Sequence, residues 1–194
     1  MIKIGLTGGI GAGKSYVASR LTSLFSIPVY NCDEESKHIV ANDPSIREQL
    51  TKKVSPDVYT SEGNLNKQVL ADFIFSDKAN REVVNSIVHP AVIRHFESWT
   101  QTQHSSFVGV ESAILFESGL SLHVDRIVCV IAPLEVRISR AMLRDSSTRR
   151  QTEARINSQM SNEELARRSH YSIVNDGQTD VDTQLRNLVR LLSE

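Results

Sequence analysis

The pattern of apolar and polar positions predicts short strands that alternate with helices. Residues 2–7 form a largely apolar run of strand length, and residues 15–25 carry apolar side chains at helical spacing. Further apolar runs predict strands at residues 27–31, 107–111, 125–131 and 171–174. This alternation is typical of an α/β fold with a parallel sheet.

Residues 44–105 lack strand-like alternation and show helix signals instead. Asp or Asn at a cap position and Pro in the first turn are the signals that start these helices. They predict helices that begin at Pro44, Lys67 and Lys78, the last of which ends at Val88, and a separate helix from Pro90 to Trp99. The span is too long for a simple connection, so we expect a helical substrate-binding insertion.

The carboxyl-terminal third alternates again between strand and helix. Ser161 to Glu164 has the pattern of a capping box, and residues 181–192 form an amphipathic closing helix. We expect one domain, residues 1–194, with three parts. These are a core of residues 1–43, 106–133 and 170–194, the insertion of residues 44–105, and a lid of residues 134–169.

Composition excludes several classes of partner. The 194 residues carry 22 basic and 23 acidic side chains, so no global positive field attracts nucleic acid or an anionic membrane. No apolar run approaches the ~20 residues that span a bilayer. Cys32 and Cys129 are the only cysteines and show no metal-binding spacing. We therefore expect a cytoplasmic protein that acts on small molecules.

Residues Gly8 to Ser15 read GGIGAGKS and match the phosphate-binding loop G-x-x-x-x-G-K-[ST] at every fixed position. The loop stands between the first predicted strand and the first predicted helix, which is the order it requires. Glycine has no Cβ, so the backbone can turn its N–H groups inward around phosphate oxygens at a helix N-terminus. The alternative is a glycine-rich turn that binds nothing.

The loop predicts a nucleoside triphosphate and Mg²⁺ as ligands. Lys14 supplies a mobile positive charge to the β- and γ-phosphates, and the Ser15 hydroxyl is the expected Mg²⁺ ligand. The predicted nucleotide-binding residues in this segment are Gly8, Gly9, Gly11, Ala12, Gly13, Lys14, Ser15 and Tyr16.

Two acidic residues stand at the ends of predicted strands. Asp33 follows the second strand, where ligands of open α/β sheets bind, and is either the N-cap of the next helix or a catalytic residue. Glu111 ends the third strand and has the position of a Walker-B carboxylate that approaches Mg²⁺ or its waters. Apolar runs that end in glutamate are common, so this second pattern is weak alone.

Arginines dominate residues 134–170, which contain eight of them and no lysine. Arg137, Arg140 and Arg144 are three and four residues apart, so they share one helix face. The arginine fork binds phosphate oxygens in a bidentate way, so this segment suits a lid over a bound nucleotide. A solvated helix face is the preferred interpretation for Arg149, Arg150, Arg167 and Arg168.

Taken together, these residues resemble the dephospho-coenzyme A kinase family along nearly the whole chain. The family's loop opens with Leu-Thr-Gly-Gly-Ile-Gly, present here at residues 6–11. The further matches are Asp33, His89-Pro90, Glu111, Leu115-Phe116-Glu117, Arg140, Arg144, Arg155-Ile156, Gln159 and Asn175. On position alone, His89 is either a structural residue at a helix junction or a polar contact for a ligand.

The resemblance implies a P-loop kinase fold with a five-stranded parallel sheet, a helical lobe for the coenzyme A precursor and a mobile lid. The implied reaction transfers the γ-phosphoryl group of ATP to the ribose 3′-hydroxyl of dephospho-coenzyme A. Asp33 is then the catalytic base, a role that phosphoryl transfer requires of one carboxylate. Lys14, Arg140 and Arg144 act on the transferring group. Asn175 joins the ATP-binding residues, and the expected acceptor-side residues are Asp33, Lys37, Arg81, His89 and Glu111.

Four departures from the family pattern are local. Tyr16 stands where many of these kinases have threonine, and we expect its ring to lie beside the triphosphate. The others are Asn31 in place of Asp, Ser112-Ala113 in place of Pro-Leu, and Ser169-His170 in place of Ala-Asp.

Two alternatives stay open. The loop identifies the phosphoryl donor but not the acceptor, so another small-metabolite kinase of the same fold is the nearest one. A nucleotide-dependent switch would need a guanine-reading Asn-Lys-x-Asp, but Asn66-Lys67 is followed by Gln68 and Val69. For assembly we expect a monomer or a weak homo-oligomer.

Overall fold

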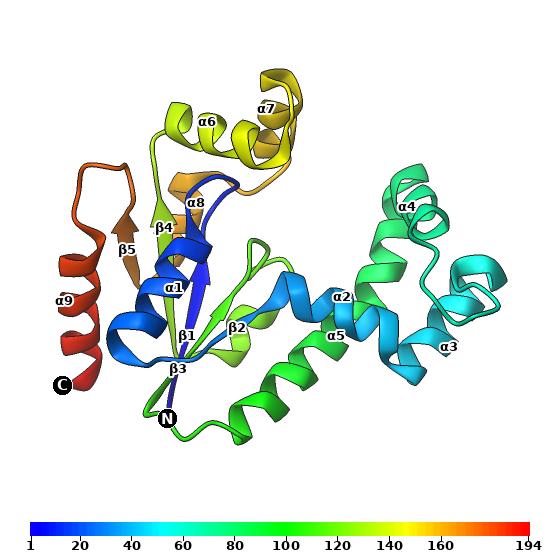
Figure 1. The fold of residues 1–194 in the computed structure, drawn as a ribbon, viewed down its shortest axis with the longest axis horizontal. Helices are drawn as coiled ribbons and strands as arrows, with labels where there is room; N and C mark the ends of the chain where they lie inside the picture. Colours follow the sequence, from blue (N-terminus) through cyan, green and yellow to red (C-terminus); the bar gives the residue numbers. More distant parts are fainter. The chain divides into compact units, whose positions relative to one another are not determined.

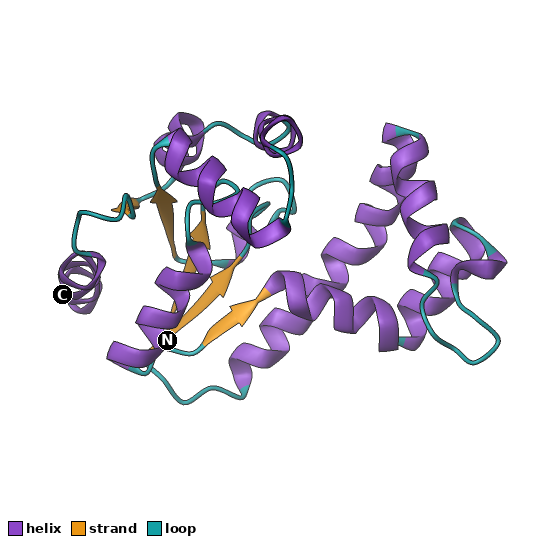
Figure 2. Cartoon of the chain, turned by 45° about the horizontal axis from the view of Figure 1, so that its top comes forward, coloured by secondary structure: helices purple, strands orange, loops and turns teal.

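The computed structural model describes residues 1–194, which divide into two compact units. The sheet unit contains Met1–Tyr30 and Gln103–Glu194, and the helical unit contains Asn31–Thr102. Figure 2 shows helices and loops alone in the helical unit, whereas strands and helices alternate in the sheet unit.

Five parallel strands form the sheet, in the order β2-β3-β1-β4-β5. They are β1 (Ile2–Thr7), β2 (Val29–Asn31), β3 (Phe107–Glu111), β4 (Arg126–Ile131) and β5 (Tyr171–Val174). Segments from both ends of the chain meet here, with β1 between β3 and β4 (Figure 1). The predicted α/β fold with a five-stranded parallel sheet is confirmed.

The helices of the sheet unit bury the apolar faces of the strands. They are α1 (Lys14–Phe25), α6 (Leu134–Asp145), α7 (Arg149–Asn157), α8 (Asn162–Arg168) and α9 (Val181–Ser193), with a short 3₁₀ helix at Leu120–His123. Ile4 and Leu6 are fully buried in one cluster with side chains of α1 and α9. Gly5 points to the opposite face, where a Cβ would meet Leu115 and Val124.

The helical unit is organised around its longest helix, α5. Its elements are α2 (Cys32–Asn42), α3 (Pro44–Lys53), a 3₁₀ helix at Pro56–Val58, α4 (Lys67–Ser76) and α5 (Lys78–Gln101). Helix α5 packs against α2, α3 and α4. The predicted caps are present, because side-chain oxygens of Asp43, Asn66 and Asp77 accept backbone N–H groups at the starts of α3, α4 and α5.

Two expectations about this region need correction. The compact helical unit begins at Asn31 instead of residue 44, because α2 packs on α3 and α5. The two helices predicted on either side of Pro90 are one continuous helix. Proline inside a helix costs about 3 kcal/mol, and we attribute the continuity to Val88, Ala91 and Val92, which are buried on both sides of it. No helix combines the length and apolar character needed to cross a membrane.

Candidate active site

The phosphate loop joins the end of β1 to the start of α1. Gly11 and Gly13 have φ values of 77° and 93°, in the region that favours glycine. Packing also excludes a side chain at both positions, because a Cβ would overlap the Arg137 backbone at Gly11 and the Asn175 amide at Gly13. The glycine pattern is therefore required by backbone conformation and by neighbours that are distant in sequence.

Lys14 and Ser15 occupy the first turn of α1. The Lys14 Nζ donates to the carbonyl oxygen of Gly8 at 2.9 Å, so this side chain folds back across the loop. The Ser15 hydroxyl donates to Oε1 of Glu111 at 2.6 Å. Glu111 lies at the buried end of β3, opposite Leu6 of β1, and the parallel pairing brings its carboxylate to the loop. The weak Walker-B pattern thus corresponds to a real contact.

The donor atoms of Ser15 and Glu111 fit Mg²⁺. A hydroxyl and a carboxylate offer the hard oxygen ligands that this ion prefers. No cluster of three or more His, Cys, Asp or Glu side chains could hold a metal by itself. A metal here would take most of its ligands from phosphates and water, which is how Mg²⁺ is bound in nucleotide sites.

The tip of the loop is held by side chains from the region expected to form the lid. The Arg137 Nε donates to the carbonyl oxygen of Ile10 at 3.0 Å, and the Ile10 N–H donates to Oε1 of Gln159 at 2.9 Å. Asn175 follows β5 and donates from Nδ2 to the carbonyl oxygen of Ala12 at 2.9 Å. The Asn175 amide therefore supports the loop backbone.

Arg140 and Arg144 lie further along α6. Arg140 donates from Nη1 to the carbonyl oxygen of Asn175 at 2.8 Å. Arg144 forms a bidentate pair with Asp145, with bonds of 2.7 and 3.1 Å, and Arg155 donates to the same carboxylate at 2.6 Å. Hydrogen bonds from Arg144, which has the larger effect, and from Arg155 hold the pKa of Asp145 well below its ordinary value.

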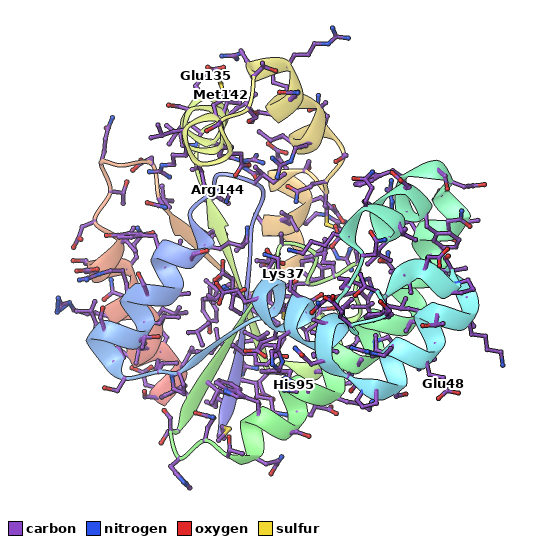
Figure 3. The ribbon with its side chains drawn as sticks, turned by 45° about the vertical axis from the view of Figure 1, so that its right-hand side comes forward. Lys37, Glu48, His95, Glu135, Met142 and Arg144 are labelled. Carbon is purple, nitrogen blue, oxygen red and sulfur yellow. The ribbon has the colours of Figure 1, made fainter.

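Helix α6 has two distinct sides. Figure 3 shows Glu135 and Met142 on its outer side and Arg144 on the opposite side. Arg137 lies three residues before Arg140, and Arg140 lies four residues before Arg144, so all three share this opposite side. There Arg137 contacts the phosphate loop and Arg140 contacts Asn175. The shared face predicted for these arginines is thus the face turned toward the loop.

Asp33 does not cap the helix that follows β2. The Oδ1 atom of Asn31 accepts the N–H groups of Asp33 at 3.0 Å and Glu34 at 3.2 Å, so Asn31 is the N-cap of α2. The capping interpretation of Asp33 is therefore wrong. Its carboxylate is exposed in the first turn of α2, directly after a strand of the sheet.

The other residues expected on the acceptor side lie in the helical unit. Lys37 is exposed on α2 one turn after Asp33, and Arg81 is exposed on α5. His89 is partly buried on α5, and burial lowers the pKa of its imidazole. Tyr16, in the sheet unit, is 51% exposed on α1.

His170, which departs from the family pattern, and several surface residues make defined contacts. His170 accepts the Ile127 N–H through Nδ1 at 3.0 Å. Arg149 and Arg167 form surface ion pairs, as expected for solvated helix faces. Arg168 is also exposed, as expected, and lies over the ring of Phe116, with 4.2 Å between its Cζ and the ring centroid. Ser161 caps α8, but Glu164 pairs with Arg167 and leaves the capping box incomplete.

A cavity of about 410 Å³ opens at the carboxyl ends of β4 and β5. Its lining residues are Ile131, Ala132, Pro133, Asn162, Glu163, Ala166, Val174 and Asp176. Asn162 also lies against Gly9, which places this cavity next to the phosphate loop. A mostly apolar lining with a few polar groups is typical of small-molecule sites.

Sequence reasoning missed Arg137 as a site residue and noted Gln159 only through the family resemblance. The spacing of Arg137, one turn before Arg140 on the same helix face, could have indicated that it belongs to the site. No local pattern marked Gln159, which is 149 residues from its partner Ile10.

The sheet topology and this loop define a P-loop kinase. A family model described as dephospho-CoA kinase matches residues 2–181, so the chain belongs to the dephospho-CoA kinase family. A dephospho-CoA kinase from Bacteroides fragilis strain YCH46 is 46% identical over 192 residues, which cover 98% of this chain and 93% of the relative.

Solved structures show the same fold. The Thermus thermophilus protein TT1252 superimposes with a TM-score of 0.82 at 31% identity, covering 99% of this chain and 96% of the other. The dephospho-CoA kinase from Campylobacter jejuni has a TM-score of 0.71 at 20% identity, with coverage of 98% and 96%, which shows likeness of fold alone.

Proposed function

We propose that this kinase transfers the γ-phosphoryl group of ATP to the 3′-hydroxyl of dephospho-CoA. The observation that carries the proposal is a phosphate loop in which Lys14 bonds to Gly8 and Ser15 bonds to Glu111. This loop occurs in a chain of the dephospho-CoA kinase family. The substrates are small molecules, and neither nucleic acid nor a membrane is a partner. We also propose that the protein acts in the cytoplasm as a monomer or a weak homo-oligomer.

The loop residues bind the triphosphate in this proposal. Backbone N–H groups of the loop that have no partner within the protein bind phosphate oxygens, and Lys14 exchanges the Gly8 carbonyl for the β- and γ-phosphates. Ser15 would hold Mg²⁺ directly, with Glu111 on the ion or its waters, and the ion when bound neutralises charge on the phosphates. Tyr16 is proposed to lie beside the triphosphate.

The lid arginines act on the transferring group. Arg140 and Arg144 stand on the face of α6 turned toward the loop, and guanidinium groups bind phosphate oxygens in a bidentate way. Arg144 forms a bidentate pair with Asp145. We propose that it exchanges this carboxylate for phosphate as negative charge spreads over the transferring group.

Asp33 takes the proton of the acceptor hydroxyl in this proposal. Its exposed carboxylate follows β2 directly and is released from capping by Asn31. Lys37, one turn further on α2, together with Arg81 and His89 on α5, binds the acceptor.

An ATP-consumption assay with alternative acceptors tests the proposal. The purified protein is incubated with ATP, Mg²⁺ and one of dephospho-CoA, adenosine, AMP or shikimate, with Lys14→Ala as the control for contaminating kinases. We expect turnover with dephospho-CoA alone, and none with the control. Turnover that is faster with another acceptor would reassign the substrate, and acceptor-independent hydrolysis would indicate a nucleotide-dependent switch.

A further inference from the structure

The backbone of Ile10, at the tip of the phosphate loop, is held on both sides by side chains that follow β4. Its N–H donates to Gln159, in the turn between α7 and α8, and its carbonyl oxygen accepts from Arg137, in the first turn of α6. Both main-chain hydrogen-bonding groups of Ile10 are therefore occupied by side chains of residues 134–169.

Arg137 is placed in an unusual environment for a charged side chain. It is 5% exposed, and no carboxylate lies within ion-pair distance of its guanidinium group. Its guanidinium lies against Gly9 and its backbone against Gly11. Burial lowers its pKa, while the negative charge of Glu163 acts in the opposite direction. A buried charge without an ionic partner is costly, and attraction for an anion bound in the adjacent loop would offset this cost.

We propose that Arg137 and Gln159 are positioning residues that hold the phosphate loop ready for ATP. The inference rests on the proposed role of this loop in binding ATP. The loop contains four glycines, and glycine loses more conformational freedom on ordering than any other residue. Hydrogen bonds that order the loop before the ligand arrives remove this cost from the binding step. The buried charge of Arg137 adds attraction for phosphate, which is strong where water is excluded.

The same contacts attach both ends of the lid to the loop. Arg137 lies near the start of α6, and Gln159 lies after α7, while Leu165 of α8 is buried against the sheet unit. Residues 138–158 connect these two attachments, and Arg140 among them is bonded to the carbonyl oxygen of Asn175.

Nucleotide binding without an acceptor tests the proposal. The dissociation constant of Mg·ATP is measured by calorimetry for Arg137→Met, Arg137→Lys, Gln159→Met and the double Met variant. Arg137→Met should weaken binding by about tenfold or more and Gln159→Met by several-fold, because each removes one ordering hydrogen bond. Arg137→Lys keeps the charge, so its dissociation constant for Mg·ATP should lie between those of Arg137→Met and the wild type. The fold loss of Mg·ATP affinity in the double variant should be smaller than the product of the fold losses in the two single variants, since both residues act on Ile10.

Two further measurements separate positioning from a general structural role. Hydrogen exchange at the Ile10 amide should be faster in Gln159→Met and near normal in Gln159→Glu, which keeps an acceptor oxygen. In turnover assays the KM for ATP should rise while the KM for dephospho-CoA stays unchanged. Arg150→Met is the matched control, because Arg150 is an exposed arginine of α7, and it should bind Mg·ATP like the wild type.

Wild-type ATP affinity and wild-type exchange at Ile10 in folded Arg137→Met and Gln159→Met proteins would overturn the proposal. If Arg137→Met does not fold, Arg137→Lys and Gln159→Met decide the outcome. The binding assay contains no acceptor, so it stands even if dephospho-CoA is not the substrate.

Discussion

The Asp33 carboxylate does not cap the helix to which it belongs. Asn31 provides the cap of α2, where its side-chain oxygen accepts two backbone N–H groups. In the proposed function this carboxylate, which directly follows a strand of an open α/β sheet, accepts the proton of the acceptor hydroxyl. The position of Asp33 in the sequence was compatible with either capping or catalysis. Because Asn31 is the cap, an effect of substituting Asp33 on turnover can now be separated from an effect on the helix.

We expect Asp33→Asn to reduce turnover by roughly 10²- to 10⁴-fold, the usual contribution of a general base. Its melting temperature and ATP affinity should stay close to wild type, because the cap belongs to Asn31. Steady-state turnover with dephospho-CoA, calorimetric binding of ATP and a thermal melt measure these three quantities.

Asn31→Ala is the matched control, and it should lower stability by about 1 kcal/mol through loss of the cap. A folded Asp33→Asn protein that phosphorylates dephospho-CoA at nearly the wild-type rate would remove Asp33 from the mechanism. Glu111, the other acidic residue at a strand end, would then be examined.

At the scale of elements, α6 carries two kinds of arginine on one face. Arg137, in its first turn, is buried and bonded to the phosphate loop, whereas Arg144, in its last turn, is exposed and paired with Asp145. The start of the helix is therefore attached to the phosphate loop, and its end carries an exposed ion pair. This division suits a lid that is anchored at the loop and brings charge to the phosphates from its far end.

We expect Arg140→Ala and Arg144→Ala each to lower turnover more than they weaken binding of dephospho-CoA. Negative charge on the transferring group is stabilised most in the transition state, so groups that contact it affect the rate first. Separate measurement of kcat and of the dissociation constant for dephospho-CoA checks this. Arg150→Ala, which removes an exposed arginine from α7, should leave both near wild type. Weakened binding with unchanged kcat would make these arginines ground-state binders.

At the scale of the whole molecule, we expect stability to depend on pH through His89 of α5. Burial lowers the pKa of this imidazole in the folded protein, so the unfolded chain binds a proton more readily. The sign follows from linkage, because stability rises with pH wherever the unfolded state binds more protons. His89 therefore stabilises the fold above the ordinary histidine pKa of about 6.5, and this contribution is lost as the pH falls below it.

We predict that the free energy of unfolding decreases between about pH 7.5 and about pH 5.5, and that His89→Gln makes this decrease smaller. Urea unfolding at several pH values measures the slope. His38→Gln, at an exposed histidine of α2, is the control and should keep the wild-type slope. Asp145 does not interfere, because its lowered pKa affects stability only below the ordinary carboxylate range. An identical slope in His89→Gln would assign the pH dependence to other groups.

The sequence by itself determined the features that depend on neighbours along the chain. All five strands, the glycine loop and the caps at Asp43, Asn66 and Asp77 follow from local patterns, because hydrogen bonding and backbone conformation act over a few residues. The family, and with it the kind of reaction, also followed from motifs whose spacing the sequence shows directly.

Tertiary structure decided what depends on distant segments. Pro90 lies inside one long helix because burial on both sides outweighs a local helix-breaking tendency. Ser15 meets Glu111 across 96 residues, and Ile10 meets Arg137 across 127, because the order of parallel strands brings their carboxyl ends to one edge of the sheet. Local spacing does not specify that order, so the contacts of Arg137 and Gln159 with Ile10 are seen only in the folded chain.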